Sequence, residues 1–381
     1  MKATVIQSMD EVDPASWDAL VPPGDPLLAH AFLAAMERSG SVAPETGWDP
    51  CHIVIHDPGG GLAGAMPLYE KAHSWGEFVF DFAWAQAYDR SGLPYYPKLV
   101  SAVPFTPATG PRLLAADDRE DVRDALLQAA LALAEARNCS SLHLLFGDPE
   151  TDRVAGAQGL QPRLDCQFHW RNEGYSSFDD FLAGFRSSRR KKLKRERRRI
   201  REAGITFRWL DGLDLTDELL DRIYPFYERT FLMRGNPPYL NRAFFEEIRE
   251  TLPASLVIIL AEGAGRPLAA AICLRGRNVL YGRYWGSEAD YHSLHFETCF
   301  YQGIDYSIHH GLDRFEPGAQ GEHKLRRGFQ PTRTGSWHWI GQPAFAEAIA
   351  GYLQREREAI EAYIDDAGQQ LPFRRSGSEN P

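Results

Sequence analysis

Apolar and polar residues follow two periods along the chain, one typical of β-strands and one typical of α-helices. Residues 51–57 and 62–71 are β-rich and flank a Pro-Gly-Gly-Gly turn, so they predict a hairpin. Helical spacing and acids at its start predict a helix over 118–137, with a strand at SLHLLF after it. The aromatic passage 95–114 contains several prolines, which remove backbone donors, so it should line a cleft or cross a sheet edge.

The second half of the chain repeats this order. Its predicted elements are helices at 216–234 and 241–251, a hairpin over 255–276, a strand at 278–286, a helix from about 293 to 310, and strands at 312–317 and 336–341. In both halves a meander of strands precedes a strand, a helix and a further strand. This order predicts an internal duplication of an α/β unit.

The predicted fold class is therefore α/β with mixed sheets, in two tandem domains. We place the first domain at 1–172, as the acceptor side, and the second at 173–368, as the donor side. The polar residues 369–381 predict a disordered tail. With 381 residues, 44% of them hydrophobic, the chain is long enough for two buried cores.

Composition narrows the class of protein further. No segment offers the roughly 18 uncharged apolar residues of a membrane helix, and the first residues lack the features of a secretion signal, so a soluble, cytoplasmic protein is expected. The five cysteines are scattered without a C-x-x-C pair, which predicts reduced thiols and no metal site. Phosphate-binding, dinucleotide-binding, serine-hydrolase and zinc-protease motifs are absent from the sequence.

Charge is distributed unevenly. Residues 186–201 contain eleven Lys or Arg and one acid, Glu196, and carry +10, whereas the net charge of the whole chain is -10. Phe185, Leu193 and Ile200 recur at helical spacing, so this segment predicts a basic helix with a narrow buried stripe. A solvated helix that balances an acidic body is one interpretation. A phosphate-binding helix is the other, and it assigns donor binding to Arg189, Arg190 and Lys191.

Polar residues also crowd the segment RFEPGAQGEHKLRRGF. It follows a predicted strand, and strand ends are where α/β folds place their sites. Glu316 or His323 could accept a proton from an amine, and Lys324 could hold a donor phosphate or stabilise charge on a carbonyl oxygen. The same cluster supplies the remaining candidates, with Arg326 and Arg327 for the donor and Gln320 and Glu322 for the substrate.

Further candidates come from two aromatic segments. In YGRYWG, bulky residues alternate with Gly282 and Gly286, which would let a ligand approach the backbone. Arg283, Tyr284 and Trp285 are therefore candidate substrate-binding residues, although Trp285 also suits core packing. In the first half, Tyr96 is a candidate for the wall of an acceptor pocket, and a proline-stiffened surface loop explains it almost as well.

The basic segment RSSRRKKLKR, the run HFETCFYQGIDYSIHHGLDRFEPG and the segment GAQGEHKLRRGF resemble the Fem-like predicted N-acyltransferases of the GNAT superfamily. The resemblance is to their uncharacterised, peptidoglycan-biosynthesis-like group. It implies two tandem GNAT-like domains and an acyl or aminoacyl group passed to an amine, with a cell-wall precursor as one such acceptor. The donor would be an acyl-CoA or an aminoacyl-tRNA, with no permanently bound cofactor. The usual GNAT pyrophosphate loop is not legible in GSEADYHSLHFET, so the choice between these donors stays open.

The leading hypothesis is an N-acyltransferase that works by direct transfer, because no serine or cysteine stands beside a histidine in a nucleophile arrangement. A second hypothesis is a non-catalytic adaptor that docks on RNA or an anionic surface through residues 186–201. A third is a structural duplicate whose site has decayed.

Overall fold

The computed structural model describes residues 2–289, 291–319 and 321–374, which form two compact units. Unit 1 holds the chain up to Cys166, with Tyr239–Phe244 and Arg333–Ala362; unit 2 holds Gln167–Pro238, Phe245–Thr332 and the chain from Tyr363 onward. Four elements pass from one unit into the other: β9 (Gln161–Arg171), α9 (Arg242–Thr251), β15 (Gln330–Ile340) and α12 (Pro343–Gln369).

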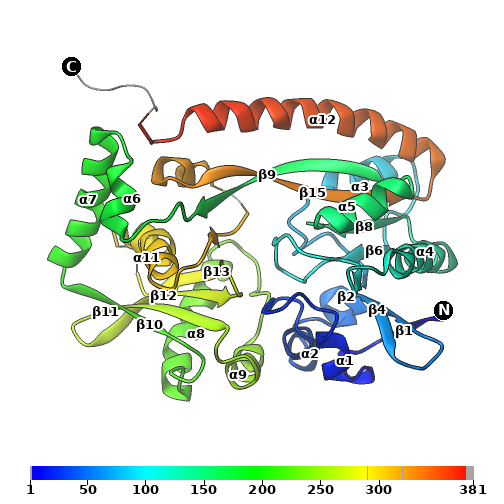
Figure 1. Ribbon diagram of the computed structural model, residues 1–381, viewed down its shortest axis with the longest axis horizontal. Helices are drawn as coiled ribbons and strands as arrows, with labels where there is room; N and C mark the ends of the chain where they lie inside the picture. Colours follow the sequence, from blue (N-terminus) through cyan, green and yellow to red (C-terminus); the bar gives the residue numbers. More distant parts are fainter. Residues whose placement is uncertain (1, 290, 320, 375–381) are drawn as a thin grey trace. The chain divides into compact units, whose positions relative to one another are not determined.

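Unit 1 carries the first set of elements (Figure 1). They are β1 (Lys2–Ile6), η1 (Met9–Glu11), α1 (Pro14–Asp18), α2 (His30–Arg38), η2 (Pro44–Thr46), β2 (Trp48–Pro50), β3 (His52–His56), β4 (Leu62–Met66), β5 (Tyr69–Lys71), α3 (Phe82–Arg90), β6 (Lys98–Ser101), β7 (Leu114–Ala115), α4 (Glu120–Ala136), β8 (Ser141–Leu145) and α5 (Pro149–Ala157). Strands β1, β3, β4 and β7 form an antiparallel sheet in that order. The predicted hairpin is confirmed as β3 and β4. The proline-rich passage is broken into β6 and β7, as its prolines require.

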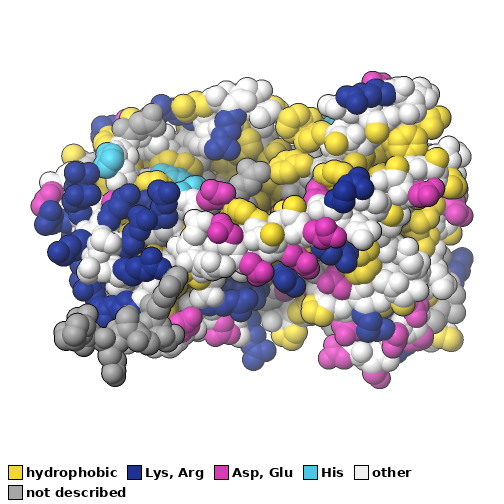
Figure 2. Space-filling view, turned by 90° about the horizontal axis from the view of Figure 1, so that it is seen from above, with side chains coloured by type: hydrophobic (Ala, Val, Ile, Leu, Met, Phe, Trp, Pro, Cys, Tyr) yellow, Lys and Arg dark blue, Asp and Glu magenta, His cyan; other side chains and the backbone are white. Residues whose placement is uncertain are grey.

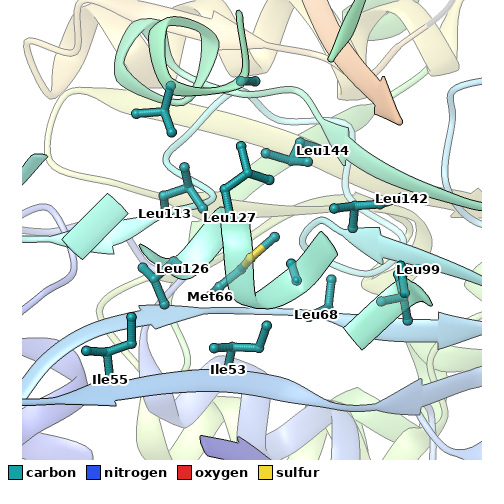
Figure 3. Close-up of a cluster of buried hydrophobic side chains, with 14 of the residues drawn as sticks. Ile53, Ile55, Met66, Leu68, Leu99, Leu113, Leu126, Leu127, Leu142 and Leu144 are labelled. Carbon is teal, nitrogen blue, oxygen red and sulfur yellow. The ribbon is translucent and has the colours of Figure 1, made fainter. Parts of the chain in front are cut away.

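The core of unit 1 lies under α4 (Figure 3). Leu126 and Leu127 of α4 are fully buried among side chains from β3, β4, β6 and β8. Strands β6 and β8, on either side of α4 in the sequence, pair in parallel. The helix and the strand after it agree with the predicted elements, whereas β6 lies between β5 and β8 within the sheet, and the passage 95–114 had been expected to line a cleft or cross a sheet edge.

Unit 2 contains α6 (Phe178–Ala183), α7 (Ser187–Glu202), β10 (Ile205–Leu210), α8 (Asp217–Leu232), β11 (Leu256–Gly263), β12 (Arg266–Arg275), β13 (Val279–Ser287), α10 (Leu294–Phe296), η3 (Glu297–Tyr301), α11 (Gln302–His309), β14 (Arg314–Glu316) and η4 (Glu322–Arg327). Strands β10 to β13 form an antiparallel meander, and β14 then pairs in parallel with β13. Helices α10 and α11 and the π-helical turn η3 form one continuous helix, as predicted for about 293–310. The parallel pairs β6/β8 and β13/β14 therefore occupy equivalent places in the two units.

Gly286 allows α8 to lie against β13. A Cβ atom at Gly286 would stand 1.9 Å from the carbonyl oxygen of Phe226 in α8, so helix and strand backbones meet there. The glycine thus serves close packing of the helix, whereas the sequence had suggested the approach of a ligand.

Replacing Gly286 with alanine should therefore destabilise unit 2. Backbone atoms must move to admit the methyl group, so we expect a loss of about 2–3 kcal/mol in the free energy of unfolding. Gly61→Ala is the matched control, because a Cβ there meets nothing within 4 Å. Chemical denaturation measures both, and an unchanged midpoint for Gly286→Ala would contradict the packing role.

Residues after α12 return to unit 2. Phe373 contacts Phe185 with ring centroids 5.0 Å apart, and the side chain of Arg186 donates hydrogen bonds to the carbonyl groups of Leu371 and Phe373. Disorder from Gln369, as the polar composition suggested, therefore does not extend to residues 369–374, because an aromatic contact holds them. Residues 375–381 lie outside the described residues. None of the described helices has the length and apolar composition needed to cross a membrane.

Candidate functional site

The basic segment forms α7, and its predicted stripe is buried. Phe185, Leu193 and Ile200 are exposed by no more than 3% and face the interior of unit 2. The remaining positions of α7 are mostly cationic and exposed. Figure 2 shows this concentration of Lys and Arg side chains over the α7 end of unit 2, with histidine side chains beside it.

A groove of about 410 Å³ runs beside α7, and we call it the α7 groove. It is lined by Arg189, Lys192, Leu193, Arg195, Glu196, Arg199, His292, Ser293, Phe296, His323, Arg326 and Arg327. The groove thus brings together α7, the start of the helix at 294–309 and the short turn η4. Three of the predicted donor-binding residues, Arg189, Arg326 and Arg327, line it with the candidate base His323.

Two of the predicted donor residues do not reach this groove. Lys191 lines a second groove of about 510 Å³ on α7, together with Ser188, Lys192, Lys194, Arg195, Arg198 and Arg201. Arg190 lines neither groove. Because both grooves are cationic, α7 presents positive charge along more than one face.

Glu196, the only acid among residues 186–201, fixes η4 against α7. Its Oε2 atom accepts hydrogen bonds from the hydroxyl of Tyr301 and from Nη2 of Arg327, the latter at 3.2 Å. Nε of Arg327 also donates to the Tyr301 oxygen at 3.0 Å. The Arg327 guanidinium lies 3.4 Å from the centre of the Phe296 ring. All three polar side chains are less than 10% exposed, so they form a buried ionic network.

Other cations of the α7 groove lack such a partner. Within the described part of the chain, no acidic side chain forms an ion pair with Arg189, Lys192, Arg195 or Arg326. By contrast, Arg197 pairs with Glu297 and Asp305. The four uncompensated cations are therefore the residues that a bound anion would neutralise.

Lys324 lies on the inner side of η4. It is 3% exposed, and Nζ donates a hydrogen bond of 2.7 Å to the carbonyl oxygen of Gly318. Burial lowers the pKa of this lysine to about 7. Burial thus disfavours the charged form of Lys324, unlike that of an exposed lysine.

Lys324 lies near the end of the paired strands β13 and β14. Pairing of β13 with β14 ends at Tyr281 and Glu316, and Gly318 follows shortly after on the β14 side. A Cβ atom at Gly318 would lie 3.8 Å from the carbonyl oxygen of Gly282, so the two chains are still neighbours where the pairing ends. Lys324 therefore reaches the segment just beyond the last paired residues of the two parallel strands.

The two candidate bases differ in their surroundings. Glu316 is 4% exposed, and its Oε1 atom accepts a hydrogen bond of 2.7 Å from Nε of Arg314. The Oε2 atom of Glu316 lies 4.0 Å from Nε2 of the buried His169. Burial, and then the charges of Lys324 and Arg327, lower the pKa of His323, so its imidazole is neutral and can accept a proton.

The substrate-binding candidates of β13 take structural positions. Tyr284 packs against Tyr227 of α8, with ring centroids 5.0 Å apart, and Trp285 packs against His295 at 4.9 Å. Arg283 occupies a β-bulge opposite β12 and lies over the ring of Tyr284. The core-packing alternative for Trp285 thus agrees with its contacts.

The other substrate candidates are dispersed. Glu322 is exposed and accepts a hydrogen bond of 3.2 Å from the hydroxyl of Tyr363, and Gln320 lies outside the described residues. Tyr96 belongs to unit 1, where its hydroxyl lies 2.9 Å from Oγ of Ser74. No group of three or more potential metal ligands occurs among the described residues.

Sequence reasoning missed Tyr301, His292 and Phe296, because only the folded chain brings the start of this helix beside α7. Glu196 did carry a signal, as a single acid within eleven cations.

Comparison with solved structures identifies the fold. The structure of FemX aligns with a TM-score of 0.55 at 14% identity, over 92% of this chain and 100% of FemX. The C-terminal domain of a putative lysylphosphatidylglycerol synthetase from Agrobacterium fabrum gives 0.54 at 10% identity, over 93% of this chain and 98% of that domain. L-PGS from Bacillus licheniformis aligns with a TM-score of 0.50 at 10% identity, over 93% of this chain and 99% of that chain. The predicted α/β class with two tandem domains agrees with these likenesses.

No curated protein matches the chain significantly. A family profile described as FemAB-like, peptidoglycan biosynthesis/recognition, matches residues 8–375. The match spans both units and supports the predicted class, a transferase of the acyl- or aminoacyl-transfer type. The chain belongs to the FemAB-like family.

Proposed function

We propose that the protein is an N-acyltransferase in which the α7 groove holds the phosphates of an activated donor and η4 supplies the catalytic groups. One observation carries this proposal. The six residues of η4 place His323 and Arg326 in a groove of uncompensated cations, and they also place Lys324 beside the end of the β13/β14 pairing. Donor binding and catalysis would then share a single rigid turn.

The chemical step is direct transfer. The amine nitrogen of the acceptor attacks the donor carbonyl carbon, a C–N bond forms, and the bond from that carbon to the thiol sulfur or ribose oxygen of the leaving group breaks. Neutral His323 accepts the proton that the amine loses, and protonated Lys324 stabilises the negative charge that develops on the carbonyl oxygen. The leaving group takes up a proton and departs.

Thiol chemistry does not favour a covalent intermediate. Burial raises the pKa of Cys273 to about 12 and that of Cys299 well above its ordinary value. Both thiols therefore remain protonated at neutral pH, and the thiol form is a poor nucleophile.

Two donors share the chemistry that the α7 groove recognises, an acyl-CoA and an aminoacyl-tRNA. Both carry phosphates and a reactive carbonyl. A CoA nucleotide needs only a local cluster of cations, whereas the phosphate backbone of a tRNA would also engage the second groove on α7. Removing positive charge from the second groove should therefore weaken the binding of a tRNA donor more than that of an acyl-CoA.

Thermal stability in the presence of candidate donors tests the proposal. We expect acyl-CoA species or bulk tRNA to raise the melting temperature at low salt, and Arg326→Gln to reduce that shift strongly, because Arg326 has no acidic partner in the described chain. A shift with CoA compounds that survives Lys191→Gln/Arg198→Gln indicates the small donor. A shift with tRNA that these changes reduce indicates aminoacyl transfer.

Glu202→Gln serves as the matched control, since Glu202 is an exposed residue at the end of α7 that lines neither groove. It should leave every shift within experimental error or raise it slightly. Absence of a shift with any donor would reject donor binding in the α7 groove. Tight tRNA binding with no transfer product would favour the RNA-docking adaptor instead.

A further inference from the structure

Three aromatic side chains are exposed together on a short segment of unit 1. Trp75 is 55% exposed, Phe80 51% and Phe82 36%. The ring centroid of Phe82 lies 5.5 Å from that of Trp75 and 6.1 Å from that of Phe80, so the rings form one continuous surface. We call these three residues the aromatic patch. Isolated exposed aromatic residues are common, and a contiguous apolar group of about this size is often functional.

Buried charges hold the segment that carries the aromatic patch. Lys98 is fully buried, and its ammonium group pairs with Glu77 at 2.8 Å and with Asp81. Glu77 and Asp81 both lie within the patch segment and are no more than 3% exposed. Burying three charges is costly unless they pair, so this network ties the segment firmly to the core.

The backbone of the patch is held as well. Nη1 of Arg163 donates a hydrogen bond of 2.9 Å to the carbonyl oxygen of Phe80, and Nζ of Lys71 lies 3.4 Å from that of Trp75. Arg163 is itself paired with Glu356 at 2.8 Å. The aromatic rings are therefore presented by a rigid support, which reduces the entropy lost when a partner binds.

The segment that carries the patch offers few exposed polar groups. From residue 72 to residue 88 the exposed residues are Ala72, Trp75, Phe80, Phe82, Ala83 and Gln86. Both acids in this span are buried, and Gln86 is its one exposed polar residue. A sugar, nucleotide or peptide ligand requires several placed polar groups. The hydrocarbon boundary of a bilayer requires none.

The patch is also too small for a stable dimer. Three aromatic side chains of about 150–250 Å² each, about half exposed, present about 300 Å². A stable protein interface buries about 800 Å² on each partner. Insertion of a few aromatic side chains into a membrane surface has no such minimum area, and aromatic rings are enriched at that depth.

We propose that the aromatic patch inserts into the interfacial layer of a lipid bilayer and docks the protein reversibly on a membrane surface. The attraction is apolar, so it does not depend on anionic lipid. This membrane contact does not involve the α7 groove, so the proposal stands whether the donor is an acyl-CoA or an aminoacyl-tRNA.

Sedimentation with phosphatidylcholine vesicles tests the proposal. The full chain should bind these uncharged vesicles, and binding should persist at high salt, because no ion pair is involved. The triple variant Trp75→Ser/Phe80→Ser/Phe82→Ser should bind at least tenfold more weakly. Leu213→Ser is the matched control, since Leu213 is a 79% exposed apolar residue in unit 2, outside the patch, and its change should leave binding intact.

A second measurement locates the contact. Brominated lipid should quench part of the tryptophan fluorescence of the unaltered chain, and the quenched part should shrink in Trp75→Phe, which retains an apolar ring and vesicle binding. Failure to bind phosphatidylcholine, or unchanged binding by the triple variant, overturns the proposal. Binding that requires anionic lipid and disappears at high salt also overturns it, and assigns membrane contact to α7.

Discussion

Replacing Lys324 with methionine is expected to lower kcat by about 10²–10³-fold and to stabilise the folded protein at the same time. The loss of rate follows from removing a donor that stabilises the developing carbonyl oxyanion. The gain in stability follows from burial, which lowers the pKa of Lys324 to about 7 because the charged form is desolvated. Methionine fills similar space without a charge. We expect about 2 kcal/mol in the free energy of unfolding at pH 7, after the loss of the bond to Gly318.

The free energy of unfolding should depend on pH through the protonation of Lys324. In the unfolded chain the lysine keeps its ordinary pKa near 10.5, whereas in the folded chain it is about 7. Between these values the unfolded state binds more protons, so the free energy of unfolding should rise with pH across that window. The rise should vanish in Lys324→Met. Because the protonated form is the active one, kcat should fall as pH increases through about 7.

The matched control is Lys192→Met, which removes an exposed lysine on α7. It should weaken donor binding and leave the pH dependence of stability unchanged. Stability is measured by denaturant unfolding over a range of pH, and kcat on the donor that thermal shifts identify. Full activity in Lys324→Met would remove Lys324 from the catalytic step. Protonation of His323 should also lower kcat at low pH, so only a fall at high pH that is absent from Lys324→Met reports on Lys324.

Local periodicity explains which parts of this architecture were predictable. Helix α7 and the buried positions of Leu193 and Ile200 follow from spacing within one element, and so does the β3/β4 hairpin. The order strand, helix, strand over β13, the helix at 294–309 and β14 was predicted, and β13 and β14 pair in parallel, as that succession favours.

Placement between distant elements was not predictable in the same way. The sequence grouped Glu316 with His323 and Lys324 as neighbours of one loop, yet the chain pairs Glu316 with Arg314 and directs Lys324 inward. Whether a lysine faces solvent or the core depends on tertiary contacts that no local spacing encodes. The aromatic positions on β13 carried the same ambiguity, because spacing within one strand does not show that Tyr284 packs against Tyr227 of α8.

The network of Glu196, Tyr301 and Arg327 should be the most sensitive polar element of unit 2. Glu196→Leu leaves the Arg327 guanidinium buried without its carboxylate, so we expect a loss of about 3–5 kcal/mol in the free energy of unfolding. The double variant Glu196→Leu/Arg327→Met removes both charges and should recover most of that loss. A coupling energy of this sign separates a true ion pair from two unrelated packing defects.

Glu202→Gln is again the matched control. Glu202 is the second acid of α7, but it pairs with Arg198 at the surface, where both side chains are more than 60% exposed. The Glu202→Gln substitution should change the free energy of unfolding by less than about 0.5 kcal/mol. Equal effects of Glu196→Leu and Glu202→Gln would show that the buried network contributes no more than a surface pair.

If the double variant Glu196→Leu/Arg327→Met is stable but binds donor poorly, Arg327 contributes to the groove as well as to the fold. If it binds donor normally, the uncompensated cations suffice and the network serves to hold η4 in place.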